Sequence, residues 1–292
     1  MRRLAALVAL LLLAGCSGGS PAAGRSSGAP SAATSGGGSA VPAYVALGDS
    51  YTSAPYVNLT DVADGCLRSD HNYPSLVAKA LRVRHFRDVS CAGATTADLT
   101  GRQVTFPERD LSVPPQLRAV RPGTDLVTVG IGGNDFGISS LLLSSCPTAR
   151  ASCLPASAGP RIRRDITALR PRLVASLRLV RRRAPRATVL LVGYPKIAPD
   201  HGSCPELPPL APAALGLLNR LNRSLNDAMR AAAREAGVGF VDVYRASVGH
   251  DICARVPWVN GIHTDTSRAA AMHPFGIEQR AVARLIVRQL SR

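Results

Sequence analysis

Short apolar runs alternate along the chain with amphipathic stretches, and this alternation limits the folds that the chain can adopt. Five runs rich in apolar residues are candidate strands: 44–47, 88–90, 126–131, 188–192 and 239–243. Four stretches with apolar residues at helical spacing are candidate helices: 73–83, 162–180, 212–236 and 277–290. Continuous apolar strands that alternate with amphipathic helices predict a parallel sheet covered by helices on both faces. Pro171 lies inside the second helix and is expected to kink or split it.

The first 40 residues differ from the rest of the chain. Arg2 and Arg3 precede an apolar run that is shorter than the about 20 residues of a membrane span. The run ends in Leu13-Ala14-Gly15-Cys16, which resembles a bacterial lipobox, although an ordinary secretory signal with an incidental cysteine is the alternative. We expect a lipoprotein signal peptide at 1–15, a lipidated Cys16 and a flexible Ser/Gly/Ala/Pro linker at 16–40, and a folded domain at 41–292. The protein is then extracytoplasmic, either anchored to the cell membrane through Cys16 or secreted.

Export changes the interpretation of the cysteines. Without Cys16, six remain, and an even number in an oxidising compartment indicates three disulfides. Six cysteines allow 15 pairings. Sequential pairing is favoured because each pair closes a loop next to a segment that carries candidate chemistry: Cys66–Cys91, Cys146–Cys153 and Cys204–Cys253. A metal site is not expected, since the chain contains no CxxC or HxxxH motif.

The chain is strongly basic, with a formal net charge of +16 that comes almost entirely from arginine. Such a charge suits acidic surfaces, but we favour a general arginine bias whose side chains are spread over solvated helix faces. Nucleic-acid binding is not expected, because neither aromatic stacking motifs nor zinc-finger spacings occur.

Polar and glycine-rich segments follow the predicted strands. In open parallel sheets, sites form in the loops at the carboxyl ends of the strands. Gly48-Asp49-Ser50 follows the first strand, Gly93 lies in the loop after the second, and Asn134 lies in Gly130–Asp135 after the third. A serine at an exposed bend can act as a nucleophile, and an amide after a glycine pair can donate to an oxyanion. Each segment alone could also be a helix cap or a plain turn.

The candidate base is His273, just before the last predicted helix. Five other histidines compete with it: His71, His85, His201, His250 and His263. Two other site types are excluded by sequence. Gly130–Asp135 lacks the last glycine of a dinucleotide-binding loop, and Gly48-Asp49-Ser50-Tyr51-Thr52 does not complete the GxSxG motif of α/β-hydrolases.

Taken in this order, the segments resemble the blocks of the SGNH hydrolases, also called the GDSL esterase/lipase family. The blocks are Gly48-Asp49-Ser50, Gly93, Gly132-Gly133-Asn134-Asp135 and His273-Pro274, so the resemblance spans about residues 43–290. It implies a three-layer α/β/α sandwich with a five-stranded parallel sheet, a flavodoxin-like arrangement. The even cysteine count is similar to that of the secreted actinobacterial branch.

The resemblance also implies roles. Ser50 attacks an ester carbonyl, His273 moves its proton, and the backbone N–H groups of Ser50 and Gly93 with the Asn134 amide hold the oxyanion. No metal or organic cofactor is implied, and we expect a monomer that acts on an ester substrate. Lipid or short acyl esters are favoured. Polysaccharide O-acetyl esters, acyl transfer and a catalytically silent ligand-binding lipoprotein are the alternatives.

One position departs from the family pattern. Ala270 stands three residues before His273, where the family has an aspartate that orients the imidazole. We therefore predict a Ser50–His273 dyad in which the backbone carbonyl of Ala270 accepts from the ring, with Asp265 as the reserve candidate.

Overall fold

A computed structural model describes residues 41–105, 111–138 and 158–292. Its strands are β1 (Ala43–Gly48), β2 (Thr60–Asp61), β3 (Arg68–Ser69), β4 (His85–Asp88), β5 (Gln103–Thr105), β6 (Leu111–Val113), β7 (Leu126–Gly130), β8 (Thr188–Val192) and β9 (Gly239–Val241). Its α-helices are α1 (Ser50–Ser53), α2 (Tyr73–Ala80), α3 (Ala158–Arg183), α4 (Pro212–Ala236), α5 (Val243–Ala246) and α6 (Gly276–Leu290). Short 3-10 helices are η1 (Thr96–Leu99), η3 (Gln116–Ala119) and η4 (Asp135–Gly137).

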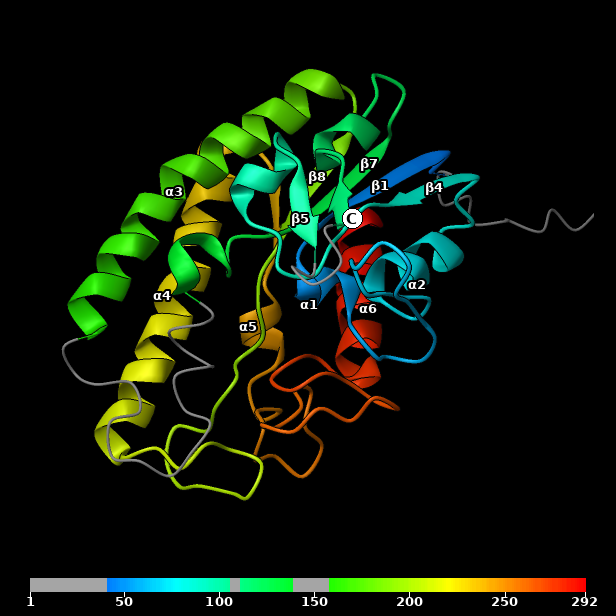
Figure 1. Ribbon diagram of the computed structural model, residues 1–292. Helices are drawn as coiled ribbons and strands as arrows, with labels where there is room; N and C mark the ends of the chain where they lie inside the picture. Colours follow the sequence, from blue (N-terminus) through cyan, green and yellow to red (C-terminus); the bar gives the residue numbers. More distant parts are fainter. Residues whose placement is uncertain (1–40, 106–110, 139–157) are drawn as a thin grey trace, which may run out of the picture. The chain divides into compact units, whose positions relative to one another are not determined.

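Five strands form one parallel sheet in the order β4-β1-β7-β8-β9 (Figure 1). Gly48 pairs with Gly130, so β1 and β7 end level with each other. The expected parallel sheet is therefore confirmed. The expected range for β4 was wrong: the strand ends at Asp88 rather than beginning there, because this edge strand alternates exposed and half-buried residues and lacks an apolar run. Two antiparallel pairs, β2–β3 and β5–β6, lie outside the main sheet.

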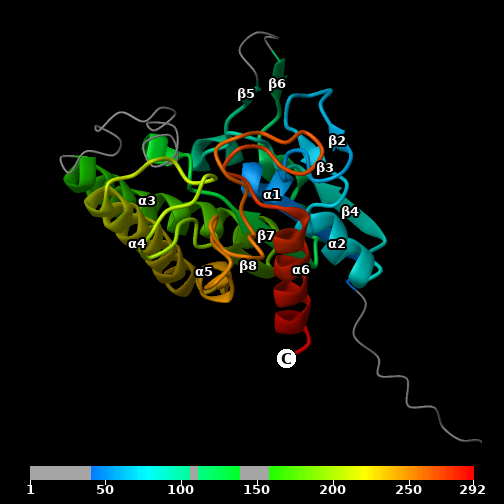
Figure 2. The ribbon, with the colours of Figure 1, turned by 90° about the horizontal axis from the view of Figure 1, so that it is seen from below.

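Helices cover both faces of the sheet, which makes three layers (Figures 1 and 2). Along β1, Val45 and Leu47 belong to the apolar core that contains the buried residues of α3 and α4. Tyr44 and Ala46 belong to the second core, which contains the buried residues of α2 and α6. This strict alternation is the two-residue period of a strand that is buried on both faces.

Pro171 does not split α3, which is continuous over its 26 residues. The proline lies on the exposed side of the helix. Leu169 before it and Leu173 after it are both fully buried in the same core, and this packing holds the two halves together.

Two of the expected cysteine pairs are disulfides in the structure, Cys66–Cys91 and Cys204–Cys253. Cys146 and Cys153 lie outside the described residues, as do Cys16, the signal peptide and the linker. Within the described ranges, no helix has the length and apolar character needed to cross a membrane.

Candidate active site

The turn after β1 carries Ser50. β1 ends at Gly48, and α1 begins at Ser50. The Asp49 carboxylate accepts a hydrogen bond from the Tyr51 N–H at 2.9 Å, so this residue caps the short helix. A methyl group at Gly48 would overlap the Thr52 side chain and lie 2.7 Å from the Gly130 carbonyl oxygen. The tight glycine turn leaves Ser50 only 8% exposed, at the carboxyl edge of the sheet.

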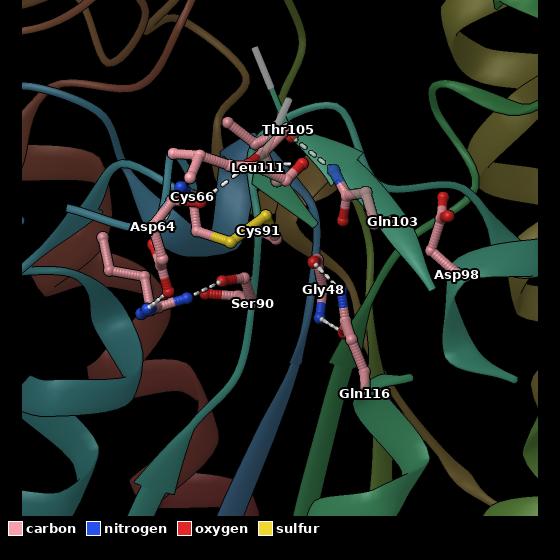
Figure 3. The surroundings of a disulfide bond; sticks show 12 residues. Gly48, Asp64, Cys66, Ser90, Cys91, Asp98, Gln103, Thr105, Leu111 and Gln116 are labelled. Atoms are coloured by element: carbon pink, nitrogen blue, oxygen red, sulfur yellow. Dashed lines mark hydrogen bonds and ion pairs between the residues drawn. A yellow bond between two sulfur atoms is a disulfide. The ribbon is translucent and has the colours of Figure 1, made fainter. Parts of the chain in front are cut away.

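The backbone of Gly48 forms two hydrogen bonds with the side chain of Gln116. Its N–H donates to Gln116 Oε1 at 2.8 Å, and its carbonyl accepts from Gln116 Nε2 at 2.9 Å (Figure 3). The same carbonyl accepts from the N–H of Cys91 at 2.9 Å. The disulfide to Cys66 therefore lies directly beside the Ser50 turn. Gln116 was not identified from the sequence, where nothing marks it.

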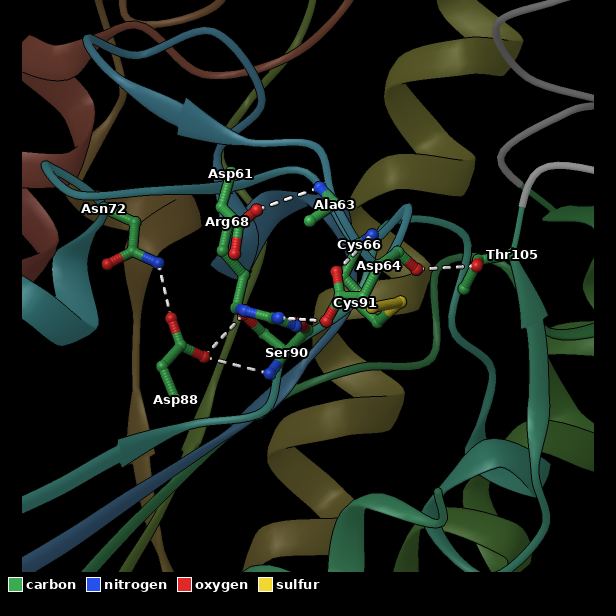
Figure 4. Close-up of polar contacts among 10 residues, drawn as sticks. All are labelled: Asp61, Ala63, Asp64, Cys66, Arg68, Asn72, Asp88, Ser90, Cys91 and Thr105. Atoms are coloured by element: carbon green, nitrogen blue, oxygen red, sulfur yellow. Dashed lines mark hydrogen bonds and ion pairs between the residues drawn. A yellow bond between two sulfur atoms is a disulfide. The ribbon is translucent and has the colours of Figure 1, made fainter. Parts of the chain in front are cut away.

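A half-buried polar network, with one ion pair, surrounds this disulfide. Arg68 pairs with Asp64 and donates to the Ser90 carbonyl at 2.9 Å (Figure 4). The carboxylate of Asp88, at the end of β4, accepts from Asn72 Nδ2 at 2.6 Å and from the Ser90 hydroxyl at 2.7 Å. These bonds join the segment after Cys66 to the end of β4 and to Ser90, the residue before Cys91.

The loops that carry Gly93 and Asn134 are bonded to each other. Gly93 adopts a left-handed backbone conformation with φ of 80°. A residue with a side chain would be strained in this conformation. The Asn134 side chain donates from Nδ2 to the Ala94 carbonyl at 3.0 Å. The next residue, Asp135, is buried, and its carboxylate accepts from the Thr96 N–H at 2.9 Å and the Thr96 hydroxyl at 2.5 Å. These bonds place the second and third predicted segments side by side.

The segment that carries His273 is fixed to the segment that carries Ser50. The Tyr51 hydroxyl donates to the Met272 carbonyl at 2.6 Å, and the Ala270 N–H donates to the Pro55 carbonyl at 3.2 Å. The rings of Tyr51 and His273 have centroids 5.4 Å apart. The structure therefore gathers the four predicted segments at one edge of the sheet, although they lie far apart in sequence.

The group that orients His273 differs from the predicted one. Nδ1 of His273 lies 2.7 Å from the carbonyl oxygen of Ala271, not of Ala270. The Ala270 carbonyl accepts instead from the His273 backbone N–H at 3.2 Å and from Asn260 Nδ2 at 3.0 Å. Met272 has a φ of 59°, and in this turn the Ala271 carbonyl faces the ring. The contact is to a backbone carbonyl, and the prediction of Ala270 as its residue was wrong.

Asp265, the reserve candidate, does not contact His273. Its carboxylate accepts from the Ser267 hydroxyl at 2.6 Å and from the Ser267 N–H at 2.9 Å. These hydrogen bonds lower the pKa of Asp265. Burial lowers the pKa of His273 from its usual value, against the opposing effect of the Ala271 hydrogen bond. A neutral imidazole at pH 7 is the form that a general base requires.

Tyr194 was not identified from the sequence. It lies two residues after β8, at the same edge of the sheet as the other loops. Sites in parallel sheets form at the carboxyl ends of strands, and this rule could have identified Tyr194 as a candidate. Its hydroxyl donates to the Asp49 carboxylate at 2.5 Å and accepts from the Gly133 N–H at 2.8 Å. Burial raises the pKa of Asp49 to about 7, against the opposing effect of the Tyr194 hydrogen bond.

Known proteins share this sequence pattern and this fold. Residues 46–274 match the profile of the GDSL-like lipase/acylhydrolase family. Lipase 2 from Streptomyces coelicolor is 38% identical over 252 residues, which cover 82% of this chain and 83% of that lipase. A lipase from Streptomyces rimosus is 31% identical over 220 residues, which cover 75% of this chain and 76% of the relative.

Solved structures agree with the sequence relatives. The chain resembles phospholipase A1 from Streptomyces albidoflavus with a TM-score of 0.71 and 28% identity, over 87% of this chain and all of that one. The extracellular lipase from Streptomyces rimosus gives a TM-score of 0.70 and 29% identity, over 85% of this chain and 99% of that one. The chain therefore belongs to the GDSL-like lipase/acylhydrolase family and is a carboxylic ester hydrolase.

Proposed function

We propose that the protein hydrolyses lipid or short acyl esters, with Ser50 as the nucleophile and His273 as the general base. The observation that carries this proposal is the attachment of the His273 segment to the Ser50 segment through the Tyr51–Met272 and Ala270–Pro55 hydrogen bonds. A serine needs a base within reach to become nucleophilic, and these two bonds bring the imidazole to the helix that begins with Ser50.

In the first half-reaction, the Ser50 hydroxyl attacks the ester carbonyl carbon. The hydrogen bond from Nδ1–H to the Ala271 carbonyl leaves Nε2 of His273 unprotonated, so Nε2 accepts the serine proton. The tetrahedral intermediate collapses when its bond to the alcohol oxygen breaks. The proton on Nε2 passes to that oxygen, and an acyl group remains on Ser50.

We expect three donors to hold the oxyanion: the Ser50 N–H, the Gly93 N–H and the Asn134 amide. Ser50 is the first residue of α1, where a helix leaves its N–H groups without intrahelical acceptors. In the described part of the chain, neither the Ser50 N–H nor the Gly93 N–H donates a hydrogen bond. Asn134 uses one of its two amide hydrogens on Ala94, and the other is left for the substrate.

The second half-reaction repeats the first with water as the nucleophile. Nε2 of His273 accepts a proton from water as its oxygen attacks the acyl carbon. The proton then returns to the Ser50 oxygen as the carboxylic acid leaves.

The names of the relatives favour lipid esters among the possible substrates. Two relatives are named lipases, and one similar structure is a phospholipase A1. Polysaccharide O-acetyl esters and acyl transfer to an alcohol are the alternatives on the same site. Deacylation by an added alcohol instead of water would reveal the transfer reaction.

The test is a panel of p-nitrophenyl esters from acetate to palmitate, with Ser50→Ala as the inactive control. A fluorophosphonate should label Ser50 in the folded protein and leave Ser50→Ala unlabelled. Rates at background for every ester, together with no label on Ser50, would favour a silent ligand-binding protein.

We further propose that the domain acts outside the cytoplasm, tethered through Cys16 and the 16–40 linker, as a monomer. The two disulfides support an oxidising compartment. Metabolic labelling with palmitate should mark the wild type and not Cys16→Ser. Mass spectrometry of unreduced peptides should find the third bridge, Cys146–Cys153, and light scattering of the 41–292 domain should give one chain per particle.

A further inference from the structure

The hydroxyl of Tyr194 joins two segments of the active site. Tyr194 is 5% exposed, and its ring stands edge-on against Tyr51, with centroids 5.2 Å apart and planes at 85°. The hydroxyl donates to Asp49 Oδ2 at 2.5 Å and accepts from the Gly133 N–H at 2.8 Å. Asp49 precedes the nucleophile in sequence, and Gly133 precedes the amide donor Asn134. One oxygen atom thus lies between the turn of the nucleophile and the turn of the oxyanion donor.

Tyr194 is itself held in place by helix α4. Asn226 Oδ1 accepts from the Tyr194 N–H at 2.9 Å. Farther along the same loop, Asn222 Oδ1 accepts from the Ile197 N–H at 3.3 Å, and Asn219 Nδ2 donates to the Pro199 carbonyl at 2.6 Å. The three asparagines share one face of the helix, because they are spaced by three and four residues. The loop that carries Tyr194 is therefore held against α4 by three hydrogen bonds.

We propose that Tyr194 is a positioning residue, which sets the distance between Ser50 and the Asn134 amide by bridging Asp49 and Gly133. The proposal rests on the function proposed above and deepens it. A small displacement of the oxyanion donors from the nucleophile slows ester cleavage without weakening the binding of the ester itself.

The ionised form of Asp49 matches its contacts. The carboxylate is 1% exposed and accepts from both the Tyr51 N–H and the Tyr194 hydroxyl. If it were protonated, its proton would compete with that of Tyr194 for the space between two oxygens. The titratable groups around it are Tyr51, Tyr73, Tyr194 and Asp135, and none of these is a cation. Removal of the Tyr194 donor therefore makes ionisation of Asp49 harder.

The test compares Tyr194→Phe with a matched control, Tyr44→Phe. Tyr44 is also fully buried, and its hydroxyl bonds to the Thr128 hydroxyl at 2.8 Å between β1 and β7, away from the site loops. Tyr194→Phe loses the two hydrogen bonds of its buried hydroxyl, and Tyr44→Phe loses one. Tyr194→Phe should lower kcat by between about tenfold and a hundredfold with little change in KM, whereas Tyr44→Phe should keep the wild-type kcat.

The pH profile separates positioning from general damage. In the wild type, the acid limb of kcat/KM should lie near pH 7, where Asp49 ionises. Tyr194→Phe should move this limb upward by about one pH unit, the size expected when a carboxylate loses one hydrogen bond. Asp49→Asn, which cannot titrate, should leave only the limb of His273, whose pKa burial lowers from its usual value. Tyr44→Phe should not move the limb.

Two outcomes overturn the proposal. An active wild type with a Tyr194→Phe variant that matches Tyr44→Phe in kcat and in pH profile refutes it and leaves the proposed esterase function standing. A wild type without activity on any ester refutes both. If Tyr194→Phe does not fold, 3-fluorotyrosine incorporated at position 194 replaces it. The more acidic phenol donates more strongly to the Asp49 carboxylate and should shift the acid limb downward, and an unmoved limb would contradict the bridge.

Discussion

Nδ1 of His273 lies 2.7 Å from the carbonyl oxygen of Ala271, two residues earlier in the same turn. A carbonyl oxygen can only accept a hydrogen bond, so the proton of the neutral imidazole is on Nδ1. Nε2 is then unprotonated and can accept a proton. The bond therefore fixes the tautomer that a general base needs, as the aspartate of a triad does, but without a full negative charge. The chain obtains an oriented histidine without a carboxylate partner.

Asp265→Asn should keep kcat/KM within about twofold of the wild type. The Asp265 carboxylate is bonded to Ser267 and makes no contact with His273, and neutralising a peripheral charge has little effect on a desolvated site. The measurement is hydrolysis of p-nitrophenyl butyrate at pH 8. A loss of about a thousandfold, as expected when a triad aspartate is removed, would show that a carboxylate orients the ring after all.

Asn134→Ala should lower kcat by about 10²–10³-fold and leave KM nearly unchanged, because the lost amide donor serves the transition state more than the bound ester. The same substitution removes the hydrogen bond to the Ala94 carbonyl. Circular dichroism and the thermal midpoint should therefore be measured beside the kinetics. A folded variant with the wild-type kcat would remove Asn134 from the oxyanion hole.

Gly48→Ala should destabilise the protein by about 2 kcal/mol or more, because the added methyl overlaps Thr52 and crowds the Gly130 carbonyl. Gly123→Ala is the matched control, since a methyl group there meets nothing within 4 Å. Chemical denaturation of both variants gives the comparison. Equal midpoints for the two variants would mean that the turn before Ser50 can relax, and that Gly48 is not needed to form it.

Much of the fold could be predicted from local pattern. β8 occupies the expected 188–192, where five consecutive residues favour a buried strand, and α4 ends where Gly237 takes a left-handed φ of 68°. β4 was misplaced because an edge strand contacts the core only weakly and carries little apolar signal. Strands were thus predicted correctly where both faces of the strand are buried, because such positions require apolar residues.

The site was predictable only in part, and the reason is physical. Ser50, Gly93, Asn134 and His273 could be chosen because each follows a strand or precedes the last helix in the order of the family blocks. The choice between the carbonyls of Ala270 and Ala271 depends on the dihedral angles of one turn, and two adjacent alanines carry no information about it. Tyr194 meets Asp49 across 145 residues of sequence, a pairing that no local pattern encodes.

Glu278, near the start of α6, should make the protein less stable as the pH rises. The side chain is 3% exposed, Gln279 Nε2 donates to its Oε2 at 2.7 Å, and burial raises its pKa to about 8. Between about pH 4.5 and 8, the unfolded chain gives up this proton and the folded protein keeps it. The unfolded state then binds fewer protons, and the free energy of unfolding falls as pH increases through this window. Asp49, with a pKa of about 7, adds to the slope in the same direction.

Glu278→Gln should flatten this dependence, because the neutral amide keeps an oxygen for Gln279 and has no proton to lose. At pH 8 the variant should be more stable than the wild type by at least about 1.4 kcal/mol, the value of one pKa unit, and near pH 4.5 the two should be equal. Glu235→Gln, which removes a carboxylate paired with Arg170 at the surface, is the control and should keep the wild-type slope. Thermal and urea midpoints from pH 4.5 to 8.5 provide the data. A wild-type midpoint that rises over this range, or equal slopes for Glu278→Gln and the wild type, would mean that Glu278 is ionised in the folded protein, and the polar network at the start of α6 would then hold a buried charge.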